Sequence, residues 1–142
     1  MGAFVDYLWD HHGGKLGSLL SGDLETARAR LLSIHGIGPE TADAILLYAG
    51  GFPTFVVDAY TKRILRRHFI IDGRASYEDV RLLFQNSESE IQNRETRSRN
   101  SRTAAVFKEY HALLVALGKR HCRTRANCDG CPLADLPHDE SK

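Results

Sequence analysis

Apolar residues recur at helical spacing along most of the chain. The first such segment, FVDYLWDHH at residues 4–12, predicts a short amphipathic helix with Phe4, Leu8 and Trp9 facing inward, and two glycines end it. The alternation expected of a half-buried strand does not persist anywhere, and the apolar run TFVV at residues 54–57 is too short to build a sheet. The pattern therefore predicts an all-α fold.

The next two helices flank a pair of glycines. Residues 23–34 place their apolar side chains on one face, and Asp23 is suited to cap the N-terminus. Residues 39–49 begin with a proline at the first helical position, where its missing N–H costs nothing. The sequence between them, SIHGIG, contains Gly36 and Gly38, so the pattern predicts a helical hairpin whose turn is poor in side chains.

Three more helices are predicted after the hairpin. Asp58 follows an apolar run and can cap the basic helix AYTKRILRRHF, and Ser76 with Asp79 forms the capping-box pattern ahead of the next helix. The last long helix is predicted at residues 104–121. Residues 86–102, NSESEIQNRETRSRNSR, are polar and poor in apolar side chains, which predicts a flexible loop.

Composition narrows the function classes. The 142-residue chain has a formal net charge of +1, so a surface that binds nucleic acid must be local rather than a property of the whole chain. No apolar run is long enough for a membrane span, and the first residues, MGAFVDYLWDHHGG, do not resemble a signal peptide. The three cysteines, Cys122, Cys128 and Cys131, cluster near the C-terminus, which favours a metal site in a reducing compartment over a disulfide framework.

Two motifs have both a structural and a functional interpretation. Gly36 and Gly38 stand at the start of a helix and would gather exposed backbone N–H groups, which can bind a phosphate of DNA whatever its base sequence. The same glycines also suit an ordinary helical hairpin in which Gly36 only ends the first helix. Asp58 is likewise either an N-cap alone or an acid placed for chemistry.

The combination of these motifs is more specific than any one of them. The hairpin, an acid eighteen positions after Glu40 and the terminal cysteines occur together and in order. From about Phe4 to Pro137 the chain therefore resembles the endonuclease III superfamily of DNA glycosylases, in which a helix-hairpin-helix precedes a catalytic aspartate. The resemblance implies two helical lobes, residues 1–52 and residues 53–142, with the first lobe incomplete.

The resemblance also implies roles for individual residues. Asp58 would be the essential carboxylate, which stabilises positive charge at the sugar or activates water once the damaged base has been flipped out of the helix. The residues implied in DNA binding are Gly36, Ile37, Gly38, Thr41 and Lys62. Lys62 and the arginines that follow it could equally form a solvated face.

Glu40 departs from the pattern of the bifunctional family members, in which a lysine stands at this position. Glutamate cannot form the Schiff base by which that lysine cuts the strand, so the resemblance implies a monofunctional enzyme that leaves an abasic site. A glutamate here also resembles the branch that excises 3-methyladenine, a cationic base that departs with little acid assistance. Glu40 is therefore predicted as a second catalytic carboxylate, with a favourable charge on the helix dipole as its alternative role.

The cysteines are a second departure. The family's 4Fe–4S cluster uses four thiolates near the C-terminus, but this chain has the spacing C-x5-C-x2-C and carries Pro137 where the fourth would fall. Either His138 or His121, or an external ligand, would complete a cluster with the three cysteines. A zinc site and a site that binds nothing are also consistent with the sequence.

Length is a third departure, because family members carry several more helices before the hairpin. The chain thus resembles a fragment, a mis-started reading frame or a divergent half-protein. Three functions stay open: a glycosylase for an alkylated purine, a non-catalytic helix-hairpin-helix DNA-binding protein, and a structural helical domain, against which Asp58 and the cysteines argue. For the first we expect a monomer that binds double-stranded DNA containing a damaged base, away from membranes, in the nucleoid-associated cytoplasm of a prokaryote.

Overall fold

The protein is helical throughout the part that its structure describes. The computed structural model covers residues 2–91 and 98–139, with side chains for residues 2–87 and 102–139. In chain order the elements are α1 (Gly2–His12), α2 (Leu16–Leu19), α3 (Leu24–Leu32), α4 (Pro39–Ala44), the π-helix η1 (Ile45–Ala49), α5 (Ala59–Arg67), α6 (Tyr77–Ile91) and α7 (Ser98–Arg120). Within these ranges the chain forms no strand, and none of the helices is long and apolar enough to cross a bilayer. The predicted all-α fold is confirmed.

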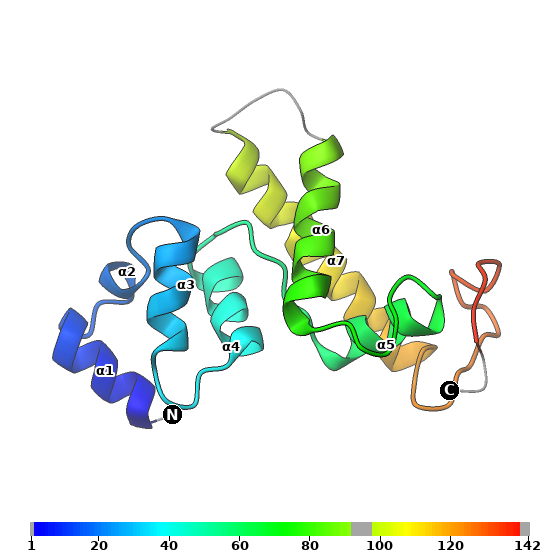
Figure 1. Ribbon diagram of the computed structural model, residues 1–142, viewed down its shortest axis with the longest axis horizontal. Helices are drawn as coiled ribbons and strands as arrows, with labels where there is room; N and C mark the ends of the chain where they lie inside the picture. The colour runs from blue at the N-terminus through cyan, green and yellow to red at the C-terminus, as the bar shows by residue number, and fades with distance from the viewer. Residues whose placement is uncertain (1, 92–97, 140–142) are drawn as a thin grey trace.

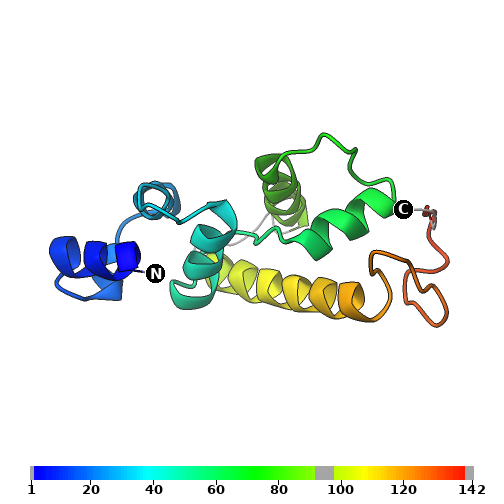
Figure 2. The same ribbon diagram turned by 90° about the horizontal axis from the view of Figure 1, so that it is seen from below.

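The helices form two groups, each around its own core (Figure 1). Helices α1 to α4 enclose a first group of buried apolar side chains that includes Leu19 and Leu31. Helices α5 to α7 and the segment before α5 enclose a second group that includes Phe55 and Phe107. The long helix α7 packs against both η1 and α5, so it bridges the two groups, as the view from below shows (Figure 2).

Local signals set the helix starts as predicted. Asp58 Oδ1 accepts the N–H of Thr61 at 2.7 Å, and Asp23 Oδ1 accepts the N–H of Thr26 at 2.8 Å. Both aspartates are therefore N-caps with the same geometry, each satisfying a backbone donor that the first helical turn cannot pair. The capping box predicted ahead of α6 is also present.

The polar segment predicted as a flexible loop is helical at both ends. Helix α6 continues to Ile91 and α7 begins at Ser98, so the prediction of a loop over residues 86–102 is wrong there, while residues 92–97 lie outside the described ranges. The segment contains no proline or glycine to stop a helix, and its glutamate, glutamine and arginine residues favour one. Low apolar content alone was therefore a poor guide to loop structure.

Trp9 does not face inward as predicted. Phe4 and Leu8 pack against the first core, but the Trp9 side chain is 65% exposed. Its indole lies over the turn that follows α1, where a Cβ added to Gly14 would come within 3.2 Å of the ring. The apolar stripe of α1 is thus narrower than the sequence suggested, because the ring covers a turn rather than the core.

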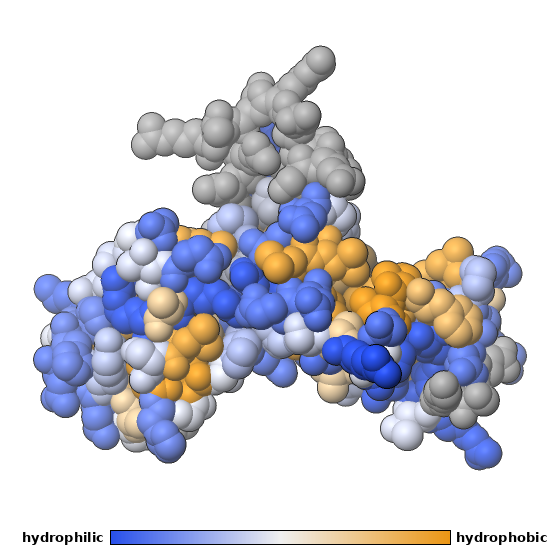
Figure 3. Space-filling model, viewed as in Figure 1, coloured by the Kyte–Doolittle hydropathy of each residue, from blue (hydrophilic) through white to orange (hydrophobic). Residues whose placement is uncertain are grey.

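Scattered apolar residues remain on the surface. The face shown in Figure 3 is mostly hydrophilic, with hydrophobic patches that interrupt it over both groups of helices. Large exposed apolar side chains include Phe69 and Ile70 after α5, Leu82 and Leu83 on α6, and Leu113 on α7. Single exposures of this kind are normal for folded proteins and need no ligand to explain them.

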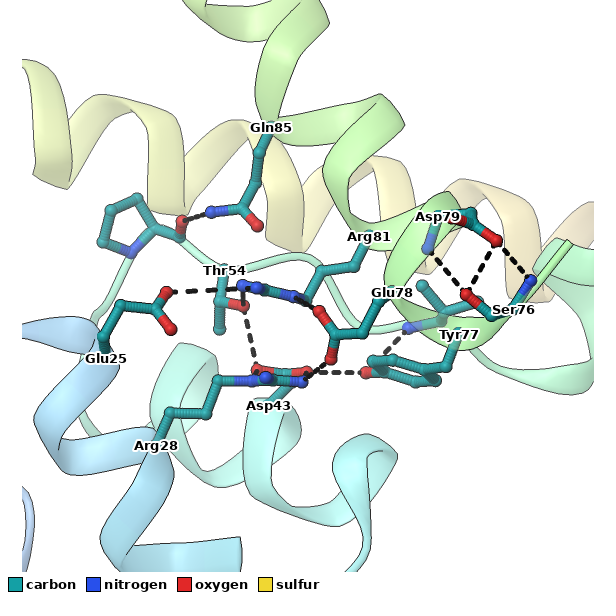
Figure 4. A network of polar contacts seen from close by, with 12 residues as sticks. Glu25, Arg28, Asp43, Thr54, Ser76, Tyr77, Glu78, Asp79, Arg81 and Gln85 are labelled. Carbon is teal, nitrogen blue, oxygen red and sulfur yellow. Dashed lines mark hydrogen bonds and ion pairs between the residues drawn. The ribbon is translucent and has the colours of Figure 1, made fainter.

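A buried polar network joins the two groups of helices (Figure 4). Asp43 of α4 is fully buried and accepts four hydrogen bonds: from Arg28 Nε at 2.9 Å and Nη2 at 3.1 Å, from Thr54 Oγ1 at 2.9 Å and from Tyr77 Oη at 2.9 Å. Glu78 of α6 also pairs with Arg28. Helices α3, α4 and α6 and the segment before α5 are therefore tied together by one carboxylate.

Candidate active site around Asp58

The turn between α3 and α4 presents bare backbone. Gly36 has a φ of 85°, which glycine adopts without strain, whereas Gly38 has a φ of −93° that any residue can adopt. A Cβ added to either glycine meets no atom within 4 Å, so neither glycine is needed to make room inside the fold. Gly38 caps α4 without a side-chain hydrogen bond, and the N–H groups of Glu40 and Thr41 have no acceptor among the described residues. The turn keeps unpaired donors on an open surface.

The other hairpin residues differ in exposure. Ile37 packs against the first core, whereas Glu40 and Thr41 are exposed in the first turn of α4. Lys62 on α5 is half-buried and lines a surface cavity of about 600 Å³. None of the described contacts joins Glu40 to Asp58, so the structure does not bring the two predicted carboxylates together as a directly bonded pair.

Asp58 has a donor close to each of its carboxylate oxygens. Oδ1 accepts the Thr61 N–H at 2.7 Å, and Oδ2 lies 3.4 Å from Nε2 of His111, while the side chain is 13% exposed. Burial raises the pKa of Asp58, but the contacts with His111 and the Thr61 N–H lower it by more, so its pKa lies below the ordinary aspartate value. Asp58 is therefore an ionised carboxylate at neutral pH.

The buried network holds the backbone just before Asp58. The N–H of Val57 donates to the Tyr77 hydroxyl at 3.3 Å, and that hydroxyl donates to Asp43 at 2.9 Å. Burial and the negative charge of Asp43 raise the pKa of Tyr77 far above its usual value, so the hydroxyl keeps the proton that it donates. Because Asp43 lies on α4, this path couples the position of Asp58 to that of the hairpin helix.

His111 and Tyr48 are site candidates that the sequence analysis missed. Nδ1 of His111, on α7, lies 2.7 Å from the hydroxyl of Tyr48 on η1, on the opposite side of the ring from Asp58. The one signal in the sequence is a histidine within the largely apolar stretch YHALLVALG. That signal does not name a partner, because the contact spans 63 positions.

Two of the four basic residues after Asp58 serve the C-terminal segment. Arg63 Nε donates to the carbonyl of Cys122 at 2.7 Å. Arg67 is 5% exposed and donates to the Cys122 sulfur at 2.9 Å, and also to the carbonyls of the next two residues. Only Lys62 and Arg66 are left as candidates for contact with phosphates from this helix.

The three cysteines line one small cavity without forming a metal site. The cavity has a volume of about 10 Å³, room for at most one water molecule, and His121 and His138 also line it. Cys128 Sγ lies 3.5 Å from His138 Nε2. Across the described residues, no three His, Cys, Asp or Glu side chains converge as a metal ion requires. The donor types suit iron or zinc, but their arrangement does not fit a cluster, which stays a prediction of the family resemblance.

Comparisons with known proteins identify the family. The chain is 43% identical over 109 residues to a provisionally named DNA repair glycosylase of Methanocaldococcus jannaschii, a match that covers 77% of the chain and 44% of that protein. It is 28% identical over 116 residues to endonuclease III of Sulfolobus acidocaldarius (80% and 45%) and 25% identical over 122 residues to endonuclease III of Bacillus subtilis (85% and 49%). The chain belongs to the endonuclease III-like superfamily. No family model matches it. The chain spans about half the length of the curated relatives it matches.

In this endonuclease III-like chain, hydrogen bonds anchor the segment around Pro137, the position where a fourth cysteine would be expected. The Pro137 carbonyl lies 3.1 Å from Nδ1 of His68, at the end of α5, and the N–H of Asp139 donates to the Arg67 carbonyl at 2.9 Å. The tail is thus attached to the helix that Asp58 begins, by contacts that need no metal.

Proposed function

We propose that the protein is a DNA glycosylase that hydrolyses the N-glycosidic bond of a damaged base, an alkylated purine, and leaves the strand intact. Asp58 carries this proposal, because it is an ionised, largely buried carboxylate whose backbone is coupled to a hairpin with open N–H groups. Similarity to DNA repair glycosylase and endonuclease III sequences supports the same reaction class. We also propose the division into lobes at residues 1–52 and 53–142.

The chemistry assigned to Asp58 is electrostatic. Breaking the bond between the sugar and a base develops positive charge at C1′, and a nearby carboxylate lowers the energy of that transition state. The Thr61 N–H and His111 Nε2 already face the two oxygens of Asp58. The side chain is therefore better suited to present negative charge to the sugar than to remove a proton from water.

Glu40 is the reason for proposing base release without strand cleavage. A lyase needs an amine that forms a Schiff base with C1′, and the exposed residue at this position of the hairpin helix is a carboxylate. Water is then the nucleophile and an abasic site is the product. We assign Glu40 the role of a second carboxylate, which suits a cationic alkylated base, and no step of the reaction runs through the cysteine loop.

The hairpin is the proposed DNA contact. The open N–H groups of the turn can bind phosphate oxygens of double-stranded DNA without reading its sequence, and the protein would act as a monomer. The proposed contact residues are Gly36, Ile37, Gly38, Thr41 and Lys62. Because Ile37 packs inward, it contributes its backbone and fixes the turn to the core.

A second candidate function is a non-catalytic DNA-binding module. It is favoured by one observation, that the hairpin turn keeps the N–H groups of Glu40 and Thr41 open for a phosphate, which needs no chemistry at Asp58. Both functions predict binding to DNA through the hairpin, so only base release separates them.

Asp58→Asn is the decisive variant. Its amide oxygen can still accept the Thr61 N–H, so the cap persists while the negative charge is lost. A duplex that contains an alkylated purine is incubated with each protein, and free base and alkali-labile sites are measured. We expect release by the natural chain and none by Asp58→Asn, with little change in DNA affinity by fluorescence anisotropy.

Asp23→Asn is the matched control. Asp23 caps α3 through the same hydrogen bond, at 2.8 Å, but at the end of that helix away from the hairpin. This variant should release base at the rate of the natural chain. Equal loss of activity in both variants would make Asp58 a structural cap, and borohydride trapping of the protein on DNA would reveal an amine nucleophile and overturn the monofunctional assignment. Binding without release by the natural chain would favour the DNA-binding module.

A further inference from the structure

A series of polar contacts joins Tyr48 to His111 and His111 to Asp58. Tyr48 of η1 lies 2.7 Å from Nδ1 of His111 on α7, and Nε2 of the same ring lies 3.4 Å from Oδ2 of Asp58. The side chains of His111 and Asp58 are only 18% and 13% exposed. The tilted rings of Tyr48 and His111 are also in contact, with centroids 5.9 Å apart.

The chemistry of Asp58 and Tyr48 determines which atom donates the hydrogen in each of these two contacts. An ionised carboxylate only accepts, so Nε2 of His111 carries the hydrogen that faces Asp58. When the ring is neutral, its Nδ1 accepts the hydroxyl proton of Tyr48. Burial and the negative charge of Asp58 raise the pKa of Tyr48, so the hydroxyl remains a donor at neutral pH. In the neutral ring, Tyr48 therefore favours the tautomer that carries its hydrogen on Nε2, towards the carboxylate.

We propose that His111 and Tyr48 are positioning residues for Asp58: Tyr48 orients the imidazole, and the imidazole holds Oδ2 of the carboxylate while the Thr61 N–H holds Oδ1. This proposal rests on the function proposed for Asp58. With both oxygens held, the carboxylate has one orientation, and its negative charge stays in place while positive charge develops on the sugar.

Among the described residues, Thr61 and His111 are the partners of the Asp58 carboxylate. Lys108, one turn away from His111 on α7, is a charged neighbour of the contact, and its Nζ lies 5.9 Å from the centroid of the Tyr48 ring. Lys108 thus faces the phenol rather than the carboxylate. Replacing His111 therefore removes the donor to Oδ2 without another described side chain to replace it.

Loss of the His111 contact should shift the pKa of Asp58 in a predictable direction. Burial raises the pKa of Asp58, and His111 is the largest of the influences that lower it. Without the imidazole, burial opposes only the Thr61 N–H, so the pKa of Asp58 rises. A merely structural role for His111, as a spacer between α7 and η1, would lower stability without moving the titration of this carboxyl group.

The first measurement needs no enzyme activity. The carboxyl carbon of Asp58, assigned with Asp58→Asn, is titrated by 13C NMR in the natural chain and in three variants. His111→Phe removes both ring nitrogens, His111→Gln places an amide N–H near the position of Nε2, and Tyr48→Phe removes only the hydroxyl. We expect the titration midpoint of Asp58 to rise in His111→Phe, to rise less in Tyr48→Phe and to return towards the natural value in His111→Gln. Asp23, which caps α3 in the same way but has no histidine partner among the described residues, is the internal control, and its titration midpoint should not change.

The second measurement is the rate of base release against pH in single turnover. In His111→Phe the acid limb should move to higher pH with the titration of Asp58, and the plateau rate should fall at least about tenfold, because the carboxylate is no longer oriented. An Asp58 midpoint that is unchanged in His111→Phe and Tyr48→Phe overturns the proposal, as does a uniform loss of rate without a pH shift. If His111→Phe does not fold, Tyr48→Phe and His111→Gln decide. Absence of release by the natural chain would reject the proposed function, while the NMR titration would still decide the contact.

Discussion

Asp43→Ala tests whether the buried network holds the two groups of helices together. Asp43 is fully buried and accepts four hydrogen bonds, two of them from the Arg28 guanidinium. Arg28 is itself almost fully buried, and without Asp43 its remaining acidic partner is Glu78. The hydroxyls of Thr54 and Tyr77 also lose Asp43 as an acceptor. The penalty comes from these buried donors, which lose an acceptor, rather than from the lost apolar contact.

The expected magnitude follows from measurements on similar sites. Removing one partner of a buried ion pair costs about 3–5 kcal/mol, a large share of the roughly 5–15 kcal/mol that stabilises an ordinary domain. With a urea m-value of about 2 kcal/mol per molar, a loss of about 4 kcal/mol lowers the unfolding midpoint by about 2 M. Circular dichroism of the helices against urea concentration measures this midpoint.

Two further variants make the test specific. Asp23→Ala removes an exposed capping carboxylate and should lower the unfolding free energy by clearly less than Asp43→Ala. Adding Arg28→Met to Asp43→Ala removes the charge that has lost its buried partner, so the double variant should be more stable than the sum of the single losses predicts. If Asp43→Ala costs no more than Asp23→Ala, or if the two losses simply add, the network does not stabilise the fold in the way described.

Two other predictions concern the hairpin and the cysteine loop. Gly38→Val should keep the stability of the natural chain, since the Gly38 φ of −93° suits any residue, yet weaken binding to DNA of every sequence alike. Gly36→Val should weaken binding too and should also lose about 1–2 kcal/mol of stability, because the Gly36 φ is 85°. Fluorescence anisotropy measures the affinities and urea unfolding the stabilities, and natural affinity in Gly38→Val would contradict the hairpin contact. Arg67 already donates a hydrogen bond to the Cys122 sulfur, and no three possible metal ligands converge among the described residues. We therefore expect protein purified without oxygen to lack stoichiometric iron and sulfide. Broad visible absorption that Cys128→Ser abolishes would instead establish the cluster.

What the sequence by itself determined is local. The caps at Asp23, Asp58 and Ser76 were predictable because each hydrogen bond joins residues only three positions apart. The hairpin was predictable for the same reason, since a glycine in the left-handed region and a proline at the first helical position act on their own turn. The loop prediction was wrong for residues 86–91 and 98–102, because low apolar content does not end a helix in the absence of helix-breaking residues.

What only the tertiary structure decided is which distant groups meet. Arg67 looked like one more cation on a basic helix, but it is buried against a sulfur 55 positions away. Asp43 had no distinguishing pattern, and Tyr48 and His111 lie 63 positions apart. A buried polar group must find a partner to repay its loss of water, and the sequence shows that such a group exists without showing which partner it takes. That choice is made by the packing of α7 across η1 and α5, which places His111 beside Asp58.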